Sequence, residues 1–233
     1  MDSLGLLPVV AVTTSSDTAL HAHDLYRFFR AGDEETLALR GVDLSVAAGE
    51  ILAVTGPSGS GKSTLLGCLA GLDEPAGGAV YVSGTRLSHR PESRRASLRA
   101  RQIGVLFQSG NLLSHLSVLH NVAFAQKLGR SAPPPPQQVL ERVGLEDRSR
   151  AFPSQLSGGE ASRAGLAVAL ANDPVVLLAD EPTGELDGQA ERDLLGLIRQ
   201  HANRGCAVVI VTHSAEVVLR ADRVISLRDG RVV

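Results

Sequence analysis

Residues 56–64 read GPSGSGKST and fit the pattern G-x-x-x-x-G-K-[ST] of a loop that binds polyphosphate. Its glycines have no Cβ, so the backbone can adopt positive φ and turn successive N–H groups toward one anion. Lys62 can reach the β- and γ-phosphates, and the Ser63 hydroxyl can ligate a magnesium ion between them. We therefore predict a site for a nucleoside triphosphate and magnesium at this loop.

The flanks of the loop support this interpretation. Residues 51–54 form a short apolar run typical of a buried parallel strand, and Leu65, Leu66 and Leu69 recur at helical spacing before Gly71 ends the pattern. A strand, a glycine loop and a helix N-terminus together make an anion site. We expect the α/β fold of a P-loop NTPase, with a RecA-like core.

Composition limits the class of protein. The chain has 233 residues, of which 43% are hydrophobic and 3% aromatic, so a large aliphatic core is available. A formal net charge of -2 predicts no nucleic-acid partner. Cys68 and Cys206 lack metal-site spacing and are interpreted as inert core residues.

No segment has the apolar length to cross a bilayer, since residues 4–12 are interrupted by Pro8, and Asp2 argues against a signal peptide. We expect an intracellular protein that acts on a membrane only through a partner. Residues 1–18 lack periodicity and are expected to form a loose extension before a single ATPase domain over residues 19–233.

Two further layers are predicted around the core. Strands over residues 19–29, 42–46 and 80–82 indicate an antiparallel β subdomain. Residues 109–155 are expected to be an α-helical insert, in which four prolines at 133–136 favour a stiff surface loop over a recognition ligand. The arginines at 90, 94, 95, 99 and 101 favour a solvated helix face over a phosphate site.

Polar residues follow several predicted parallel strands. Gln108 follows residues 103–107, the pair Asp180 and Glu181 follows residues 175–179, and His213 follows residues 207–211. Open α/β sheets bind ligands at this carboxyl edge. Asp180 can hold magnesium and Glu181 can orient or deprotonate a water, whereas Gln108 and His213, taken singly, are more often structural.

A second anion-ready helix start follows the insert. Residues 156–160 read LSGGE, in which Ser157 is a natural N-cap and Gly158 and Gly159 leave bare N–H groups. The alternative is an ordinary capped turn. After residues 183–187 a further helix through Leu194 is expected, and a last strand over residues 223–227 before an Asp-Gly turn.

Together these residues resemble the ATP-binding subunit of ABC transporters, from about residue 20 to the end. The match covers the Walker A, Q-loop, signature, Walker B, D-loop and H-loop motifs of that family, at residues 56–64, 108, 156–160, 180–181, 186–187 and 213. The phrases LSGGE, LADEPTGELD and GLDEPAGG look most like the lipoprotein-releasing and macrolide-exporter subfamily, which includes a cell-division ATPase.

The resemblance implies an ATPase that uses ATP and Mg²⁺, working as a head-to-tail homodimer beneath a separate transmembrane permease at the inner face of the cell membrane. The implied catalytic residues are Glu181, His213, Lys62 and Gln108, and the implied metal residues are Ser63, Gln108 and Asp180. The implied ATP-binding residues are Phe29, Gly56, Ser58, Gly59, Ser60, Gly61, Lys62, Ser63 and Thr64, with Ser157, Gly158 and Gly159 acting in trans. Tyr26 and Phe28 compete with Phe29 as the aromatic that stacks on adenine.

The chain also departs from the family pattern. Residues 161–163 read ASR where polar glutamine-like residues are common, and Val168 stands where an arginine is usual. The expected function is to power a permease that is an exporter or a lipid-, lipoprotein- or peptide-type system. A soluble ABC ATPase of iron–sulfur assembly and a cell-division ATPase remain alternatives, and a nucleotide kinase is disfavoured because it has no use for residues 156–160.

Overall fold

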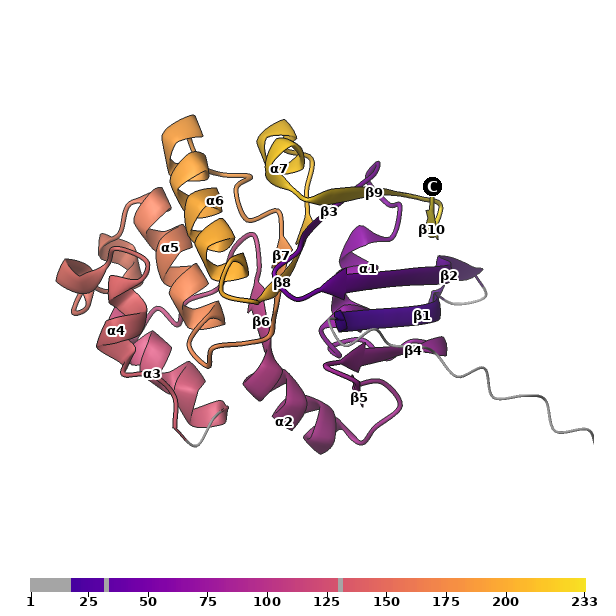
Figure 1. The fold of residues 1–233 in the computed structure, drawn as a ribbon, viewed down its shortest axis with the longest axis horizontal. Helices are drawn as coiled ribbons and strands as arrows, with labels where there is room; N and C mark the ends of the chain where they lie inside the picture. The colour runs from indigo at the N-terminus through magenta and orange to yellow at the C-terminus, as the bar shows by residue number, and fades with distance from the viewer. Residues whose placement is uncertain (1–17, 32–33, 130–131) are drawn as a thin grey trace, which may run out of the picture.

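The computed structural model describes residues 18–31, 34–129 and 132–233 (Figure 1). The expected N-terminal extension therefore lies outside the described residues, except that Thr18 is already the first residue of strand β1. Within the described ranges, no helix combines the length and the apolar character that spanning a bilayer requires.

The central layer is a six-stranded sheet with the order β10-β9-β3-β8-β7-β6. Its strands are β3 (Ile51–Thr55), β6 (Ile103–Leu106), β7 (Val176–Asp180), β8 (Ala207–Val211), β9 (Arg223–Arg228) and β10 (Arg231–Val232). All neighbours pair in parallel except β10, a short strand missed in the sequence, which pairs antiparallel with β9. The predicted apolar runs are thus confirmed as parallel strands.

Strands β3, β7 and β8 are buried on both faces of the sheet, which explains why they are apolar without alternation, whereas β9 and β10 at the edge are largely exposed. Successive residues of β3, β7 and β8 point to opposite sides. One set packs in a core with α1, and the other packs against the outer helices; the first set includes Leu52, Val54, Leu178 and Val209, and the second Ile51, Ala53, Leu177 and Ile210. Truncating a fully buried leucine in either core to alanine costs about 2–5 kcal/mol.

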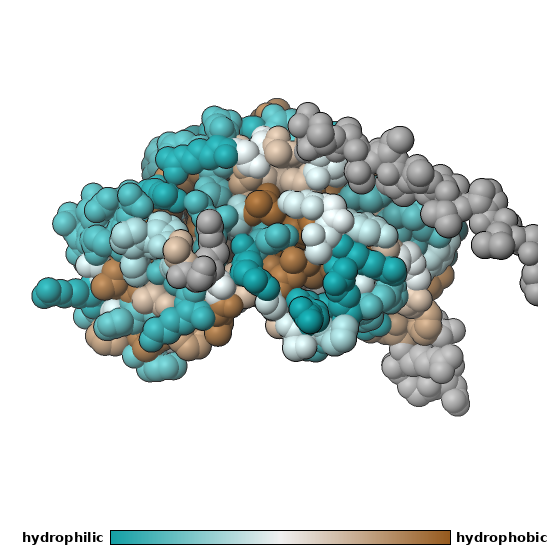
Figure 2. All heavy atoms as spheres, turned by 60° about the horizontal axis from the view of Figure 1, so that its bottom comes forward, coloured by the Kyte–Doolittle hydropathy of each residue, from teal (hydrophilic) through white to brown (hydrophobic). Residues whose placement is uncertain are grey.

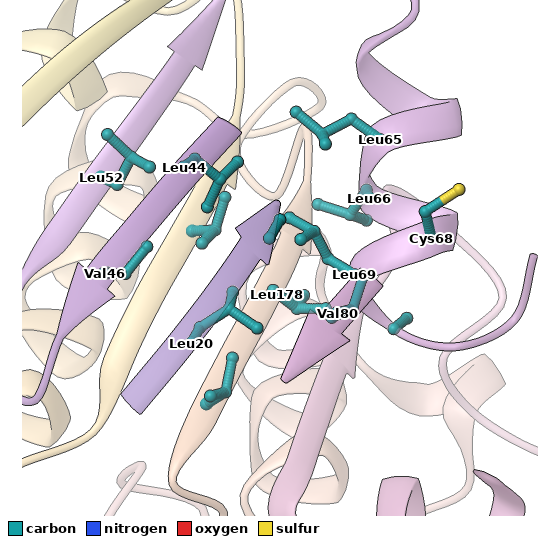
Figure 3. Packing of buried hydrophobic residues seen from close by; sticks show 14 of the residues in the cluster. Leu20, Leu44, Val46, Leu52, Leu65, Leu66, Cys68, Leu69, Val80 and Leu178 are labelled. Carbon is teal, nitrogen blue, oxygen red and sulfur yellow. The ribbon is translucent and has the colours of Figure 1, made fainter. Parts of the chain in front are cut away.

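The antiparallel β subdomain is a second sheet with the order β2-β1-β4-β5. Its strands are β1 (Thr18–Ala31), β2 (Glu34–Ala47), β4 (Gly77–Val82) and β5 (Thr85–Arg86). In β2 the buried Val42, Leu44 and Val46 alternate with exposed residues, as predicted. Figure 3 shows Leu44 and Val46 on one side of a core that Leu65, Leu66 and Leu69 of α1 complete.

Helices cover both faces of the central sheet (Figure 1). They are α1 (Lys62–Leu69), α2 (Glu92–Gln102), α3 (Val118–Leu128), α4 (Pro136–Glu141), α5 (Gly158–Ala169), α6 (Gly188–Ala202) and α7 (Ala215–Arg220), with 3-10 turns η1 (Glu146–Arg148) and η2 (Pro153–Gln155). The segment expected to be a helical insert contains α3, α4, η1 and η2. The sequence did not reveal α7.

Two expectations about this region need correction. The prolines are not all loop, because Pro136 is the first residue of α4, a position where the missing N–H has no helical partner anyway. The arginine face is not wholly solvated, because the Arg95 side chain is only 14% exposed and pairs with Glu74. Arg99 likewise donates to the Gly71 carbonyl at 2.9 Å, so both arginines tie α2 to the segment after α1.

Both cysteines are buried and free, as expected. Burial, the largest cause in each case, raises the pKa of the Cys68 thiol and that of the Cys206 thiol to about 12. At physiological pH both side chains are neutral thiols and behave as small apolar core residues.

Candidate nucleotide site

A cavity of about 650 Å³ lies at the carboxyl edge of the central sheet. The glycine-rich loop forms one wall, and residues that follow β6, β7 and β8 form another. The sequence-predicted residues that line it are Phe29, Ser58, Gly59, Gly61, Lys62, Ser63, Thr64, Gln108, Asp180, Glu181 and His213. The structure therefore brings together side chains that are far apart in the chain.

The loop wraps the cavity through its glycines. Gly56, Gly59 and Gly61 have φ of 144°, 77° and 101°, values that residues with a Cβ rarely adopt. A Cβ at Gly61 would also collide with the carbonyl oxygen of Ala38, and one at Gly56 with that of Leu227. The expected positive φ is thus observed, and the close approach of two other strands adds a second reason for glycine.

Helix α1 begins at this loop without a capping side chain. Its N-cap is Gly61, which has no side chain to accept from the first turn. Uncapped N–H groups at a helix start carry a partial positive charge and bind anions. The first-turn amides of Lys62, Ser63 and Thr64 therefore remain available to a phosphate group.

Hydrogen bonds within the glycine-rich loop hold the Lys62 side chain at the wall of the cavity. Its side chain is mostly buried, and Nζ donates to the carbonyl oxygens of Gly56 at 2.8 Å and Pro57 at 2.9 Å. Two carbonyl oxygens of the loop thus accept the hydrogen bonds that Lys62 could otherwise donate to a phosphate oxygen. Ser60 is buried, and its Oγ has no partner among the described residues. Ser60 does not line the cavity, whereas the buried cation of Lys62 does and fits a polyphosphate ligand.

Asp180 lies at the end of β7 beside the loop. Burial raises the pKa of its carboxyl, a hydrogen bond with the Ser63 side chain opposes the rise, and the nearby Glu181 charge adds to it. Ser63, Asp180 and Gln108 offer a hydroxyl, a carboxylate and an amide to one cavity. No group of three or more His, Cys, Asp or Glu suited to a metal occurs in the described ranges. This sparse oxygen set fits Mg²⁺, which takes one or two carboxylates and completes its shell with phosphate and water.

Glu181 follows Asp180 in a left-handed conformation, with φ of 45°. Its Oε2 accepts from the hydroxyl of Thr212 at 3.3 Å and from the N–H of His213 at 3.2 Å. The His213 Nε2 lies 3.6 Å from Oε1. Two strand ends therefore hold this carboxylate at the cavity, and a strained, anchored residue of this kind is typical of functional sites.

Thr212 was not predicted as a site residue. It is fully buried, and besides donating to Glu181 its Oγ1 accepts from the N–H of Ser214 at 2.9 Å. The sequence shows only a threonine between an apolar strand and a histidine, and the pairing of β7 with β8 is what places it beside Glu181.

The three aromatic candidates for the adenine contact all lie on β1 and differ in whether they line the cavity. Phe29 lines the cavity and is 43% exposed, whereas Tyr26 and Phe28 are not among its lining residues. The Arg27 guanidinium lies 4.7 Å from the centre of the Phe29 ring, within the range of a cation–π contact. The exposed Phe29 ring can accept a flat heterocycle on its other face.

The second anion-ready helix start, that of α5, lies outside the nucleotide cavity. Ser157 caps α5, Gly158 is exposed and Gly159 is half-buried, but none of the three lines the 650 Å³ cavity. Gly158 instead borders a separate cavity of about 310 Å³, which Gln108 also lines. Within one chain, the two anion-ready helix starts therefore do not meet.

Other residues of the cavity came from parts of the chain to which the sequence assigned no role. They are Thr36, Leu37, Ala38 and Arg40 of β2, Val211 of β8, and Asp229 and Gly230 of the last turn. Backbone bonds dock these parts on the loop, since the Gly230 N–H donates to Ser60 and the Arg40 N–H donates to Gly230.

Comparison with known proteins agrees with this geometry. Residues 39–184 match the family model described as ABC transporter. The macrolide export ATP-binding/permease protein MacB of Shigella flexneri and that of Escherichia coli K12 are each 41% identical over 223 residues, which cover 92% of this chain and 34% of the relative. The chain thus spans about a third of the length of these curated relatives.

Solved structures give the same result. The dimeric bacterial ABC transporter cassette MJ0796 superposes with a TM-score of 0.83 at 34% identity, covering 91% of this chain and 96% of that chain. The same cassette has been solved in a post-hydrolysis state bound to ADP and Pi. CbiO1 of Clostridium perfringens, part of the ABC transporter complex cbiONQ, has a TM-score of 0.80 at 28% identity, covering 93% and 87%. The chain therefore belongs to the ABC transporter family, whose ATP-binding cassette it matches over nearly its whole length.

Proposed function

We propose that this chain is the ATP-hydrolysing cassette of an exporter and that it drives a transmembrane permease by closing and opening a dimer. The observation that carries the proposal is the split between two anion-ready helix starts. One lies in the cavity with Lys62 and Glu181, and the other lies outside that cavity. A second copy is needed to bring both to one triphosphate.

In this proposal the cavity takes ATP. The α1 amides and Lys62 would bind the β- and γ-phosphates, with Lys62 exchanging its two carbonyl partners for phosphate oxygens. Phe29 would stack on adenine. Its position at the cavity wall supports this assignment over Tyr26 and Phe28, which are about equally exposed but do not line the cavity.

Ser63, Asp180 and Gln108 would hold Mg²⁺. The burial that raises the pKa of Asp180 supports this role, because a desolvated carboxylate gains most from a nearby cation. Bound there, the ion would neutralise charge on the β- and γ-phosphates.

Glu181 would act as the general base. Thr212 and the His213 backbone hold Oε2 of the carboxylate, and Oε1, which lies 3.6 Å from the His213 Nε2, would accept a proton from an attacking water. His213 lines the cavity with a side chain that is 59% exposed, and its Nε2 would contact the γ-phosphate. Gln108, which borders both cavities, would connect the metal site to the helical segment.

The partner copy would supply Ser157, Gly158 and Gly159 to the same γ-phosphate in a head-to-tail dimer. The dimeric state of the related cassette MJ0796 supports the formation of a dimer. Hydrolysis would remove the shared ligand and allow the two copies to separate.

The permease would dock in a groove of about 450 Å³ between α2, β6, α3 and α5. Figure 2 shows hydrophobic side chains gathered among hydrophilic ones on the face that carries α2. Leu128 lines the groove and is 63% exposed, and residues 103–105 at its floor belong to β6, the strand that leads to Gln108. A segment seated there would press on the strand that leads into the nucleotide cavity. The similarity to MacB, an export ATP-binding/permease protein, supports export at the inner face of the cell membrane.

Glu181→Gln tests the proposal. The amide keeps the size of the side chain but is a poor base, so we expect turnover to fall about 10²–10⁴-fold. With ATP and Mg²⁺ the variant should elute as a dimer in size-exclusion chromatography and as a monomer without nucleotide. Glu185→Gln, in the same loop but outside the nucleotide cavity, is the matched control. A Glu181→Gln protein that stays monomeric and hydrolyses ATP at the normal rate would contradict the proposal.

A further inference from the structure

The first turn of α5 carries an acidic side chain, and the proposed anion-binding role of this helix start does not explain why it is there. Glu160 lies three residues after the cap Ser157, at the end of the helix that would face the partner's γ-phosphate. A free carboxylate at this place would repel that phosphate. The inference below rests on the proposed function, because it concerns how the trans site is kept suitable for an anion.

Hydrogen bonds at this helix start leave a defined pair of amides free. The Glu160 carboxylate accepts from the Ser157 N–H at 2.9 Å, and the Ser157 hydroxyl accepts from the Glu160 N–H at 3.3 Å. This reciprocal capping box uses both of those donors. Among the described residues nothing accepts from the N–H of Gly158 or Gly159, so these two amides remain for a ligand.

Arg148 of turn η1 holds Glu160 in the cap. Its Nε lies 2.7 Å from Oε1 and its Nη2 3.3 Å from Oε2, a two-point contact with both carboxylate oxygens. The Glu160 side chain is 17% exposed under this contact, and that of Arg148 is 48% exposed. The arginine beside Glu160, followed by the bond from Ser157, lowers the pKa of Glu160 to about 2, so the carboxylate is ionised at any physiological pH.

We propose that Arg148 is a positioning residue of the trans phosphate site: it neutralises Glu160 and keeps that carboxylate in the capping box, so that Gly158 and Gly159 face the partner's γ-phosphate without a competing negative charge. Arg148 does not touch the phosphate itself. It acts through Glu160, and its effect is confined to the closed dimer, in which the phosphate is present.

This role differs from ordinary stabilisation by an ion pair. Arg142 and Asp173 form another partly exposed ion pair beside the helical segment, at 3.2 Å, but neither residue contacts the start of α5. Removing that pair should leave the trans site unchanged. Removing Arg148 leaves an ionised carboxylate next to the free amides of Gly158 and Gly159. The resulting loss of dimer affinity should vanish when Glu160 is replaced by a neutral side chain.

The test measures ATP-dependent dimerisation by sedimentation in the Glu181→Gln background, with four additional changes: Arg148→Ala, Glu160→Gln, both together, and Arg142→Ala. We expect Arg148→Ala to weaken the ATP-bound dimer about tenfold. Glu160→Gln should stay near the parent, because a glutamine also completes a capping box. The double variant should regain most of the lost affinity, and Arg142→Ala should match the parent.

Thermal melting of each monomer without nucleotide separates folding from the proposed effect. If Arg148→Ala and the double variant are equally weak dimers, the arginine acts only as a structural tie and the inference is wrong. It is also wrong if Arg148→Ala dimerises like the parent. If the Glu181→Gln parent itself fails to dimerise with ATP, the proposed function fails instead.

Discussion

Helices α1 and α5 both begin with free backbone amides, but they keep those amides free by different means. Helix α1 starts at Gly61, without a capping side chain, inside a cavity with a buried lysine. Helix α5 starts at Ser157, in a capping box that uses two donors and leaves the amides of Gly158 and Gly159 without an acceptor among the described residues. The first can hold a phosphate within one chain, whereas the second requires a ligand presented from outside.

The two starts also differ in how strongly the fold constrains them. A Cβ at Gly61 would meet backbone, and its φ is 101°. A Cβ at Gly158 would meet nothing within 4 Å, and its φ is not left-handed. The α1 start is thus built into the core, and the α5 start is a surface feature that substitutions can change without unfolding the protein.

The largest expected effect is on ATP binding at α1. Lys62→Ala removes the buried ammonium that would contact the β- and γ-phosphates, and charge-assisted hydrogen bonds to phosphate contribute about 1.5–3 kcal/mol each. We expect ATP affinity to fall about 100-fold in calorimetry. Gly158→Ala should leave monomer affinity for ATP unchanged, because α5 does not line that cavity. Equal losses in both variants would remove the distinction between the two starts.

A comparison of folding stability gives an expected effect of similar size. Gly61→Ala places a Cβ at left-handed φ and against the Ala38 carbonyl, so we expect the free energy of unfolding to fall by about 2–4 kcal/mol. Gly158→Ala at an open helical position should change it by less than about 0.5 kcal/mol. Urea denaturation of the two proteins measures this difference. Similar values would show that α1 is no more constrained than α5.

The adenine contact gives a smaller effect. Stacking of a base on an aromatic ring is worth about 1–3 kcal/mol, so Phe29→Ala should weaken ATP binding about 5- to 100-fold. Binding of inorganic triphosphate, which has no base, should be unaffected. Tyr26→Ala is the control, since Tyr26 lies outside the cavity. Equal loss for ATP and triphosphate would mean that the ring supports the loop and does not stack on adenine.

The smallest expected effect is the loss of the α5 cap. Ser157→Ala removes the acceptor for the Glu160 N–H and should lower the free energy of unfolding by about 1 kcal/mol. Ser93→Ala, an exposed serine of α2, should change it by less than about 0.5 kcal/mol. Differential scanning fluorimetry can resolve this pair, and an unchanged melting temperature for Ser157→Ala would show that the capping box does not stabilise α5.

The parts of the fold that were predictable from the sequence are those with local signals. The uninterrupted apolar run that became β7, the glycine loop and the serine cap of α5 depend on neighbours within a few residues. The same local signals placed Asp180 and Glu181 at a strand end. Because parallel strands end at one edge, Gln108 and His213 could also be expected there.

Other features depend on contacts between distant segments and had no local signal. Ala38 reaches the cavity because β2 packs over the glycine loop, and Thr212 reaches Glu181 because β7 pairs with β8. The partly buried Arg95 looks like any surface arginine until Glu74 comes beside it in the fold. No pattern along the chain encodes these pairings, so the sequence could not reveal them.

Our central claim is that one triphosphate is bound by α1 of one copy and α5 of another, and mixed dimers test it most directly. In the Glu181→Gln background, Lys62→Ala disables the α1 site, and Gly158→Asp puts a carboxylate at the α5 site, where the side chain has open space. Sedimentation with ATP should show each variant alone as a monomer, and their mixture as a heterodimer that holds one ATP. A mixture that remains monomeric while the Glu181→Gln parent dimerises, or a Gly158→Asp variant that dimerises as well alone as the parent does, would contradict the claim.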